Sequence, residues 1–273
     1  MSTLRRIFGV DRPLIAMCHL LGLPGRPRHD LDGGTAAIVE PLARDLDALQ
    51  DAGVDGVLFC NENDIPYQLE VGPEIPATMA AAIAQLRARI RVPFGVDILW
   101  DPKATLAVAR ATGAAFVREV FTGVFESDMG LMAPSFGDLA GYRQTIGAGG
   151  VAVFTNITPE FSRSVSGRPV ADRARSAAYL GVDALLVSGQ MAGVSAEMDD
   201  LRAAKEAAGD LPVLANTGVT HDNMARILEV ADGVIVGTSL KVDGVTWNPV
   251  DPARARRFMD TARQARSAPA VAS

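Results

Sequence analysis

The sequence is poor in cysteine and lysine, and each scarcity excludes a class of chemistry. Its two cysteines, Cys18 and Cys60, are too few for a disulfide framework and indicate a reducing compartment. No Cys-x-x-Cys or His-x-x-x-His spacing occurs, so we expect buried thiols rather than zinc ligands. The three lysines are Lys103, Lys205 and Lys241, and only Lys241 follows an expected strand. Schiff-base aldolase chemistry is therefore disfavoured, and we expect Lys241 to contact a phosphate or solvent.

Long apolar runs and an excess of positive charge are also missing. The N-terminal segment MSTLRRIFG lacks the apolar run of a signal peptide, and no stretch of about twenty apolar residues could span a bilayer. The net charge is −6, from 26 Lys and Arg against 32 Asp and Glu, which argues against nucleic-acid binding. We expect a cytoplasmic protein with a small-molecule ligand and without a membrane span. A homo-oligomer is compatible with this reading.

What the chain does contain is a regular alternation of short apolar runs and helical segments. The expected strands cover residues 14–20, 54–60, 93–99, 114–120, 151–155, 182–188, a run around 213–214, and 233–236. The expected helices between and after them include residues 35–52, 77–89, 103–111, 138–147, 170–180, 196–208 and 252–265.

Strict alternation of strands and helices predicts a parallel sheet, either closed or open. No Gly-x-Gly-x-x-Gly turn follows the first strand, which disfavours an open dinucleotide-binding sheet. The chain has 273 residues, and a barrel of eight strand–helix units needs about 250. We therefore predict an α/β fold in which residues 1–273 form a single (β/α)8 TIM-barrel domain.

Two turns of small residues, Asn-Thr-Gly and Gly-Thr-Ser, follow the last two expected strands. Backbone N–H groups without a neighbouring Cβ can converge on an anion there, and barrels commonly hold phosphate after strands 7 and 8. The alternative is that the glycines only make tight turns. The expected phosphate-binding residues are Asn216, Gly218, Gly237, Thr238 and Ser239.

Polar side chains also gather at the ends of the first four expected strands. In a barrel these ends carry the chemistry, because the loops that follow them form the catalytic face. The expected catalytic residues are His19, Glu62, Asp64, Asp97, Arg118 and Glu119. Since side chains alternate along a strand, His19 and Asp97 should point at the barrel axis, while Cys18 should face the helices.

Structural roles compete for most of these positions. An unpaired Asp97 in an apolar strand would be costly, so an ion pair with Arg118 on the next strand is a serious rival to catalysis. Glu62 and Asp64 could be solubilising charges or a turn cap, and His19 a core histidine. No cofactor is expected, although Glu62, Asp64 and Asp97 together could hold a divalent metal.

Two long loops, residues 121–136 and 156–169, exceed the usual length of about 2–6 residues. Long loops on the catalytic face are often lids that exclude water. The alternative is a disordered insertion, favoured for the second loop, which is rich in Ser and Arg. The other alternative for the second loop is that Arg163 and Arg168 bind an anionic ligand.

Several segments together resemble the BtpA/SgcQ family of barrel proteins. They are HLLGLPGRP (19–27), GVDGVLFCNENDIPY (53–67), PFGVDILWDPKATLAVA (93–109), ATGAAFVREVFTGVFESDMGL (111–131), VLANTGVTHDN (213–223) and DGVIVGTSLKVDGVTWNPVD (232–251). The resemblance implies a phosphate-binding barrel. The family is named for photosystem I biogenesis, while other members are associated with sugar metabolism and thought to be enzymes.

The chain departs from the family pattern at three places. The family tends to have Asn where Asp97 stands, and Asn-Asp where this chain has Trp100-Asp101. After the fifth strand the family usually carries a Lys-His pair, where this chain has Phe-Thr-Asn-Ile-Thr at 154–158. Two functions therefore remain open. One is an enzyme, a lyase or isomerase, that uses carboxylate and histidine acid–base chemistry on a sugar phosphate or a nucleoside-derived phosphate. The other is a non-catalytic assembly or regulatory factor on a barrel scaffold.

Overall fold

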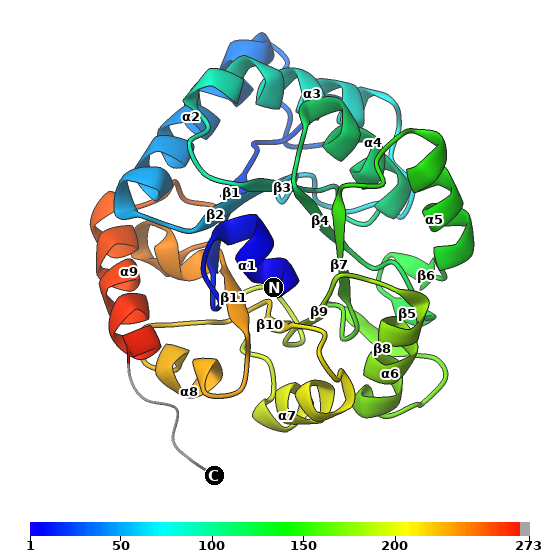
Figure 1. Ribbon diagram of the computed structural model, residues 1–273. Helices are drawn as coiled ribbons and strands as arrows, with labels where there is room; N and C mark the ends of the chain where they lie inside the picture. The colour runs from blue at the N-terminus through cyan, green and yellow to red at the C-terminus, as the bar shows by residue number, and fades with distance from the viewer. Residues whose placement is uncertain (268–273) are drawn as a thin grey trace.

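Eight parallel strands form a closed barrel in the computed structural model, which describes residues 1–267 (Figure 1). The strands are β1 (Leu14–His19), β2 (Gly56–Cys60), β3 (Phe94–Asp97), β4 (Phe116–Glu119), β7 (Ala152–Asn156), β9 (Ala184–Val187), β10 (Val213–Ala215) and β11 (Gly233–Val236). Their order around the barrel follows the chain, and β11 pairs with β1, Val234 opposite Leu14. The predicted TIM-barrel fold is confirmed.

The helices lie outside the strands as a surrounding layer (Figure 1). They are α2 (Gly34–Ala52), α3 (Glu74–Leu86), α4 (Pro102–Thr112), α5 (Phe136–Thr145), α6 (Val170–Leu180), α7 (Met198–Ala207), α8 (Met224–Leu228) and α9 (Pro252–Ser267). Short 3₁₀ turns are η1 (Arg87–Arg89), η2 (Thr238–Leu240) and η3 (Val242–Gly244). No helix within residues 1–267 combines the length and the apolar composition needed to cross a bilayer.

Local sequence explains where these helices begin and end. At α4, the Asp101 side chain accepts hydrogen bonds from the N–H groups of Lys103 and Ala104, and Pro102 occupies the first helical position. Gly113 ends the helix in the left-handed conformation that glycine adopts readily. A left-handed glycine ends α2 and α6 in the same way, at Gly53 and Gly181.

Alternation along the strands separates two layers of buried side chains. On β1, Ile15 and Met17 belong to the cluster inside the barrel, whereas Leu14, Ala16 and Cys18 pack toward the helices. The orientation of Cys18 expected from the alternation is confirmed.

The helix α1 (Thr3–Phe8) was not expected from the sequence. Ser2 caps its start, and Gly9 ends it in the left-handed conformation. Its Leu4 and Phe8 join the apolar cluster inside the barrel, where the Phe8 and Phe116 rings lie 5.3 Å apart. Figure 1 shows α1 in the centre of the ring of strands. It closes the amino-terminal end of the barrel, so a ligand has to enter at the carboxyl ends of the strands.

The two long loops pair with each other. Strands β5 (Phe125–Ser127) and β6 (Gly130–Met132) come from the first loop and β8 (Ser162–Ser164) from the second. They form a three-stranded antiparallel sheet with Glu126 opposite Arg163. Pairing satisfies backbone groups of the Ser- and Arg-rich segment, so the alternative of a disordered insertion is wrong.

Candidate active site

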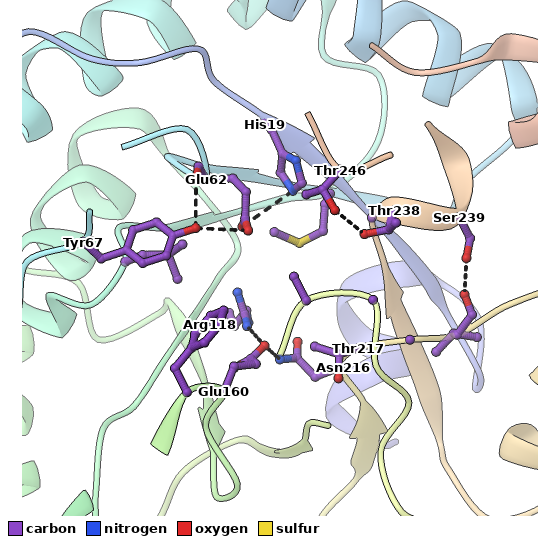
Figure 2. A pocket seen from close by; sticks show the side chains of 18 of the residues that line it. His19, Glu62, Tyr67, Arg118, Glu160, Asn216, Thr217, Thr238, Ser239 and Thr246 are labelled. Atoms are coloured by element: carbon purple, nitrogen blue, oxygen red, sulfur yellow. Dashed lines mark hydrogen bonds and ion pairs between the residues drawn. The ribbon is translucent and has the colours of Figure 1, made fainter. Parts of the chain in front are cut away.

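A cavity at the carboxyl ends of the barrel strands brings together the two groups of residues expected to form a site (Figure 2). Three of the expected catalytic residues and all five expected phosphate-binding residues line it: His19, Glu62, Arg118, Asn216, Gly218, Gly237, Thr238 and Ser239. In Figure 2, Glu62 lies across the space from Thr238 and Ser239, while Glu160 lies beside Asn216. A ligand could therefore touch both groups of residues.

Glu62, two residues beyond the end of β2, is a largely buried acid that lines the cavity. Its side chain is 12% exposed, and its Oε2 lies 3.9 Å from His19 Nε2. The Tyr67 hydroxyl lies 3.2 Å from Oε1 and 3.0 Å from the Glu62 carbonyl oxygen. Burial raises the pKa of Glu62 to about 7, although the nearby Arg118 charge opposes the increase. The carboxyl group can therefore gain or lose a proton near neutral pH.

His19 ends β1 and lies between the acidic side and the glycine turns. Burial lowers its pKa well below 6.5, and the positive charges of Lys241 and Arg118 lower it further. The imidazole is therefore neutral at physiological pH. A Cβ at Gly237 would lie 3.5 Å from His19 Cε1, so the second glycine turn approaches the ring closely.

Arg118 is held by two buried carboxylates. Its Nη1 donates to Asp97 Oδ2 at 2.5 Å and its Nη2 to Glu160 Oε1 at 2.8 Å. The expected pair with Asp97 is confirmed. Asp97 is fully buried and lies behind Arg118 rather than on the cavity surface. Burial raises the pKa of Asp97, and the guanidinium opposes that increase.

Glu160 is a site residue that the sequence reading missed. Its Oε1 also accepts from Asn216 Nδ2 at 3.3 Å, and its Oε2 accepts from Asn156 Nδ2 at 2.9 Å. Both amides donate to Ser188 Oγ at 2.8 Å, which closes the network. The one available signal was an acidic residue within an otherwise Ser- and Arg-rich loop on the catalytic face.

Asp64 and Glu119 do not line the cavity. Asp64 Oδ1 accepts from the Leu23 N–H at 2.8 Å and Oδ2 from Asn61 Nδ2 at 2.9 Å, so Asp64 fastens the loop after β1. Glu119 follows the inward-pointing Arg118 on β4, and adjacent strand residues point to opposite faces. It accepts a hydrogen bond from the Val120 N–H and faces away from the ligand space. Neither residue is placed to act on a ligand in this cavity.

The carboxylates expected to hold a metal do not converge. Asp97 contacts Arg118, Asp64 contacts the loop after β1, and only Glu62 lines the cavity. Within residues 1–267, no three His, Cys, Asp or Glu side chains are grouped as metal ligands. The structure does not support a metal site built from these three residues.

The turn after β10 lines the cavity with Thr217, Gly218 and Val219. Within residues 1–267, the N–H groups of residues 217–219 have no protein acceptor. The Gly218 and Val219 carbonyl groups accept from Asn223 Nδ2 at 2.9 Å and Ser239 Oγ at 2.7 Å, which fixes the turn. Gly218 has a left-handed φ of 61°, and a Cβ there would lie 2.1 Å from the Ser195 nitrogen. Glycine is thus required for packing as well as for donor access.

Lys241 does not take part in this site, and the expectation that it contacts phosphate or solvent is wrong. It is 2% exposed, and its Nζ donates to Asp45 Oδ2 at 2.9 Å. The Asp45 carboxylate also accepts from the Val250 N–H at 2.9 Å. The chain turns outward after η2, which carries Lys241 toward α2 instead of the cavity.

The fold and the site define a TIM-barrel protein with a ligand cavity on its catalytic face. The chain belongs to the BtpA family, whose model matches residues 10–264. The expected family is confirmed.

Two relatives and a solved structure illustrate the likeness. The putative sgc region protein SgcQ of Escherichia coli (strain K12) is 43% identical over 261 residues, covering 95% of this chain and 97% of that protein. The photosystem I biogenesis protein BtpA of Synechocystis is 30% identical over 257 residues, which cover 93% of this chain and 88% of that protein. The structure of N-(5′-phosphoribosyl)anthranilate isomerase from Pyrococcus furiosus is similar with a TM-score of 0.56 and 13% identity. The match covers 93% of this chain and 99% of that one.

Proposed function

We propose that the protein is an enzyme that binds a small phosphorylated metabolite and moves protons within it, as a lyase or an isomerase. One observation carries the proposal. A buried carboxyl group that titrates near neutrality, Glu62, lines the same cavity as a turn whose N–H groups have no protein acceptor. An acid–base group and an anion-binding turn therefore face one ligand space.

The phosphate end of the proposed ligand is held by the backbone of residues 217–219, with Gly237, Thr238 and Ser239 completing the wall. Converging N–H groups supply positive partial charge without a cationic side chain. The turns lie after β10 and β11, the seventh and eighth barrel strands, where barrels of this type commonly hold phosphate. Ligands that fit this end are sugar phosphates and nucleoside-derived phosphates.

Glu62 is the proposed general acid or base. Its pKa of about 7 lies near the operating pH, where proton transfer is most efficient. The neutral imidazole of His19 can donate or accept a hydrogen bond at a carbonyl or hydroxyl oxygen of the ligand. None of the three lysines lines the cavity, so no lysine amine is placed there for imine formation.

The direct test follows solvent deuterium into a panel of sugar phosphates and nucleoside phosphates by NMR. The enzyme should exchange a hydrogen of at least one of these compounds for deuterium from the solvent. Glu62→Gln should slow that exchange by about 10²- to 10⁴-fold. Glu206→Gln, on an exposed position of α7, is the matched control and should leave the rate unchanged. A crystal soaked in phosphate that shows no anion at residues 217–219 would contradict the binding mode.

A second candidate is a non-catalytic assembly factor, because the 30% identical relative from Synechocystis carries the name of a photosystem I biogenesis protein. This function would require no proton transfer at Glu62. Phosphate binding without deuterium exchange in any ligand of the panel would favour it over the enzyme.

A further inference from the structure

We infer that the part of the ligand beyond its phosphate is rich in hydroxyl groups and carries no carboxylate, as in an aldose or polyol phosphate. This inference rests on the proposed function and narrows its substrate class. It follows from the charges and the hydrogen-bonding groups that line the cavity around Arg118 and Asn216 (Figure 2).

The cationic side chain in the cavity is already neutralised. Of residues 1–267 that line the cavity, only Arg118 carries a permanent positive charge. Asp97 and Glu160, both buried, occupy its two terminal nitrogens at 2.5 and 2.8 Å. The guanidinium keeps N–H groups that these two bonds do not use, among them the Nε–H, which has no partner within residues 1–267, but a ligand carboxylate there would be a third anion around one cation. Arg118 therefore does not serve as a receptor for a ligand carboxylate.

Among residues 1–267 that line the cavity, no other positively charged side chain could balance a ligand carboxylate. Lys241 is directed away from the cavity and paired with Asp45, and the buried His19 imidazole is neutral. Glu62 and Glu160 both line the cavity, so a ligand carboxylate would be repelled by the ion-paired Glu160, and by Glu62 whenever that group is ionised. Like charges at close range in a buried site repel strongly.

The buried polar groups of the cavity that lack a hydrogen-bond partner are of the kind that bind hydroxyl groups. Asn216 uses its Nδ2 on Glu160 and Ser188, which leaves Oδ1 buried without a partner within residues 1–267. Trp100, which also lines the cavity, has a buried indole N–H that is likewise unpartnered there. A hydroxyl group both donates and accepts and can serve either residue, whereas a carboxylate can only accept.

Matched pairs of ligands test the inference by calorimetry. Glucose 6-phosphate is compared with 6-phosphogluconate, and erythrose 4-phosphate with 4-phosphoerythronate, alongside inorganic phosphate. Within at least one pair, the aldose phosphate should bind about tenfold or more tightly than its aldonate, and more tightly than inorganic phosphate. Equal or tighter binding of both aldonates would overturn the inference, and so would aldose phosphates that bind no better than inorganic phosphate. Failure of every ligand to bind, inorganic phosphate included, would instead overturn the phosphate site, and this inference with it.

Two variants test the cause of the discrimination. Glu160→Gln removes one negative charge and one partner of Arg118. The ratio of the aldonate Kd to the aldose phosphate Kd should therefore fall by about tenfold. Asp97→Asn removes the charge of the other partner without changing the cavity surface. It should also lower the ratio of the aldonate Kd to the aldose phosphate Kd. Glu206→Gln is the control that should leave the preference unchanged. Variants that keep their melting temperature and the full preference would show that neutralised Arg118 is not the cause, and would overturn the inference.

Discussion

Glu62 and Arg118 line the same cavity, but their surroundings affect the two charges differently: the charge of Arg118 is balanced by neighbouring carboxylates, whereas that of Glu62 is not balanced by a direct contact. Glu62 has a tyrosine hydroxyl and a neutral imidazole nearby and no cation in direct contact, so burial dominates and raises its pKa to about 7. Arg118 lies between Asp97 and Glu160, which compensate its burial. One residue is therefore available for proton transfer, whereas the other holds the structure of the site.

The free energy of unfolding should report the buried charge of Glu62. The carboxyl titrates near 4.5 in the unfolded chain and at about 7 in the folded protein, so the folded protein binds the proton more tightly between these values. Its contribution to stability is complete below pH 4.5 and is lost as the pH rises through 7. Relative to Glu62→Gln, the wild type should lose about 3 kcal/mol between pH 4.5 and 8, measured by urea unfolding. Parallel stability curves for the two proteins would refute the shifted pKa.

Removing the guanidinium should cost stability in a pH-dependent way. Arg118→Met leaves Asp97 and Glu160 buried without a cation, which should lower the free energy of unfolding by about 3–5 kcal/mol at pH 8. The loss should shrink toward pH 5, because the unpaired carboxylates take up protons in the folded state.

The control is Arg175→Met, which breaks the exposed pair with Asp172 and should cost less than about 1 kcal/mol at either pH. Equal losses in the two variants would mean that the buried network contributes no more than a surface ion pair.

At the scale of elements, the small sheet β5–β6–β8 is attached to the cavity wall through Phe161. This residue lines the cavity with a left-handed φ of 57°. Its N–H donates to the Gln190 carbonyl at 2.9 Å, and its carbonyl accepts from the Asp128 N–H at 3.4 Å. Phe161 thus connects the loops that follow β4, β7 and β9. A ligand that contacts its ring would influence all three.

We predict that residues 121–136 and 156–169 gain protection from hydrogen exchange when a phosphorylated ligand binds. The reason is that both segments are joined by the β5–β8 pairing and one of them contributes Phe161 to the cavity. Exchange mass spectrometry at saturating ligand should show slower exchange in both segments together. The outer helix α3 should show no change and serves as the internal reference. Unchanged exchange in both loops would refute their role as a lid.

At the scale of the whole molecule, one ion pair ties the beginning of the barrel to its end. Asp45 on α2 contacts Lys241, 196 residues later, and accepts from the Val250 N–H, 205 residues later. Both side chains are largely buried, at 11% and 2% exposure. The pair lies where α2 and α9 pack together, next to the closing contact of β11 with β1.

Asp45→Ala should destabilise the barrel by about 3–5 kcal/mol, because it leaves a buried ammonium and a backbone N–H without their partner. The double variant Asp45→Leu with Lys241→Met should recover most of the loss, since it removes both charges together. Urea unfolding of the three proteins measures the difference. A double variant no more stable than Asp45→Ala would show that packing, and not the isolated charge, sets the cost.

The sequence by itself determined the barrel and the two sides of its site. Apolar runs spaced by helices specify a parallel sheet, and strict alternation along a strand already directs His19 inward and Cys18 outward. Neighbouring strands of a parallel barrel stand side by side, so the pairing of Asp97 with Arg118 could be predicted. The glycine turns could be placed beside each other for the same reason. These inferences depend only on local periodicity and on the order of strands, both of which are written in the chain.

Only the tertiary structure decided the remaining features, because they depend on contacts between distant segments. Helix α1 is a short amphipathic segment until the open end of the barrel gives Leu4 and Phe8 a place to pack. Glu160 belongs to the site because two loops pair and carry it to Arg118, 42 residues away. Lys241 points away from the second glycine turn because Asp45 lies behind it. A charge selects its partner by distance in space and by burial, and neither is encoded in the residues on either side of it.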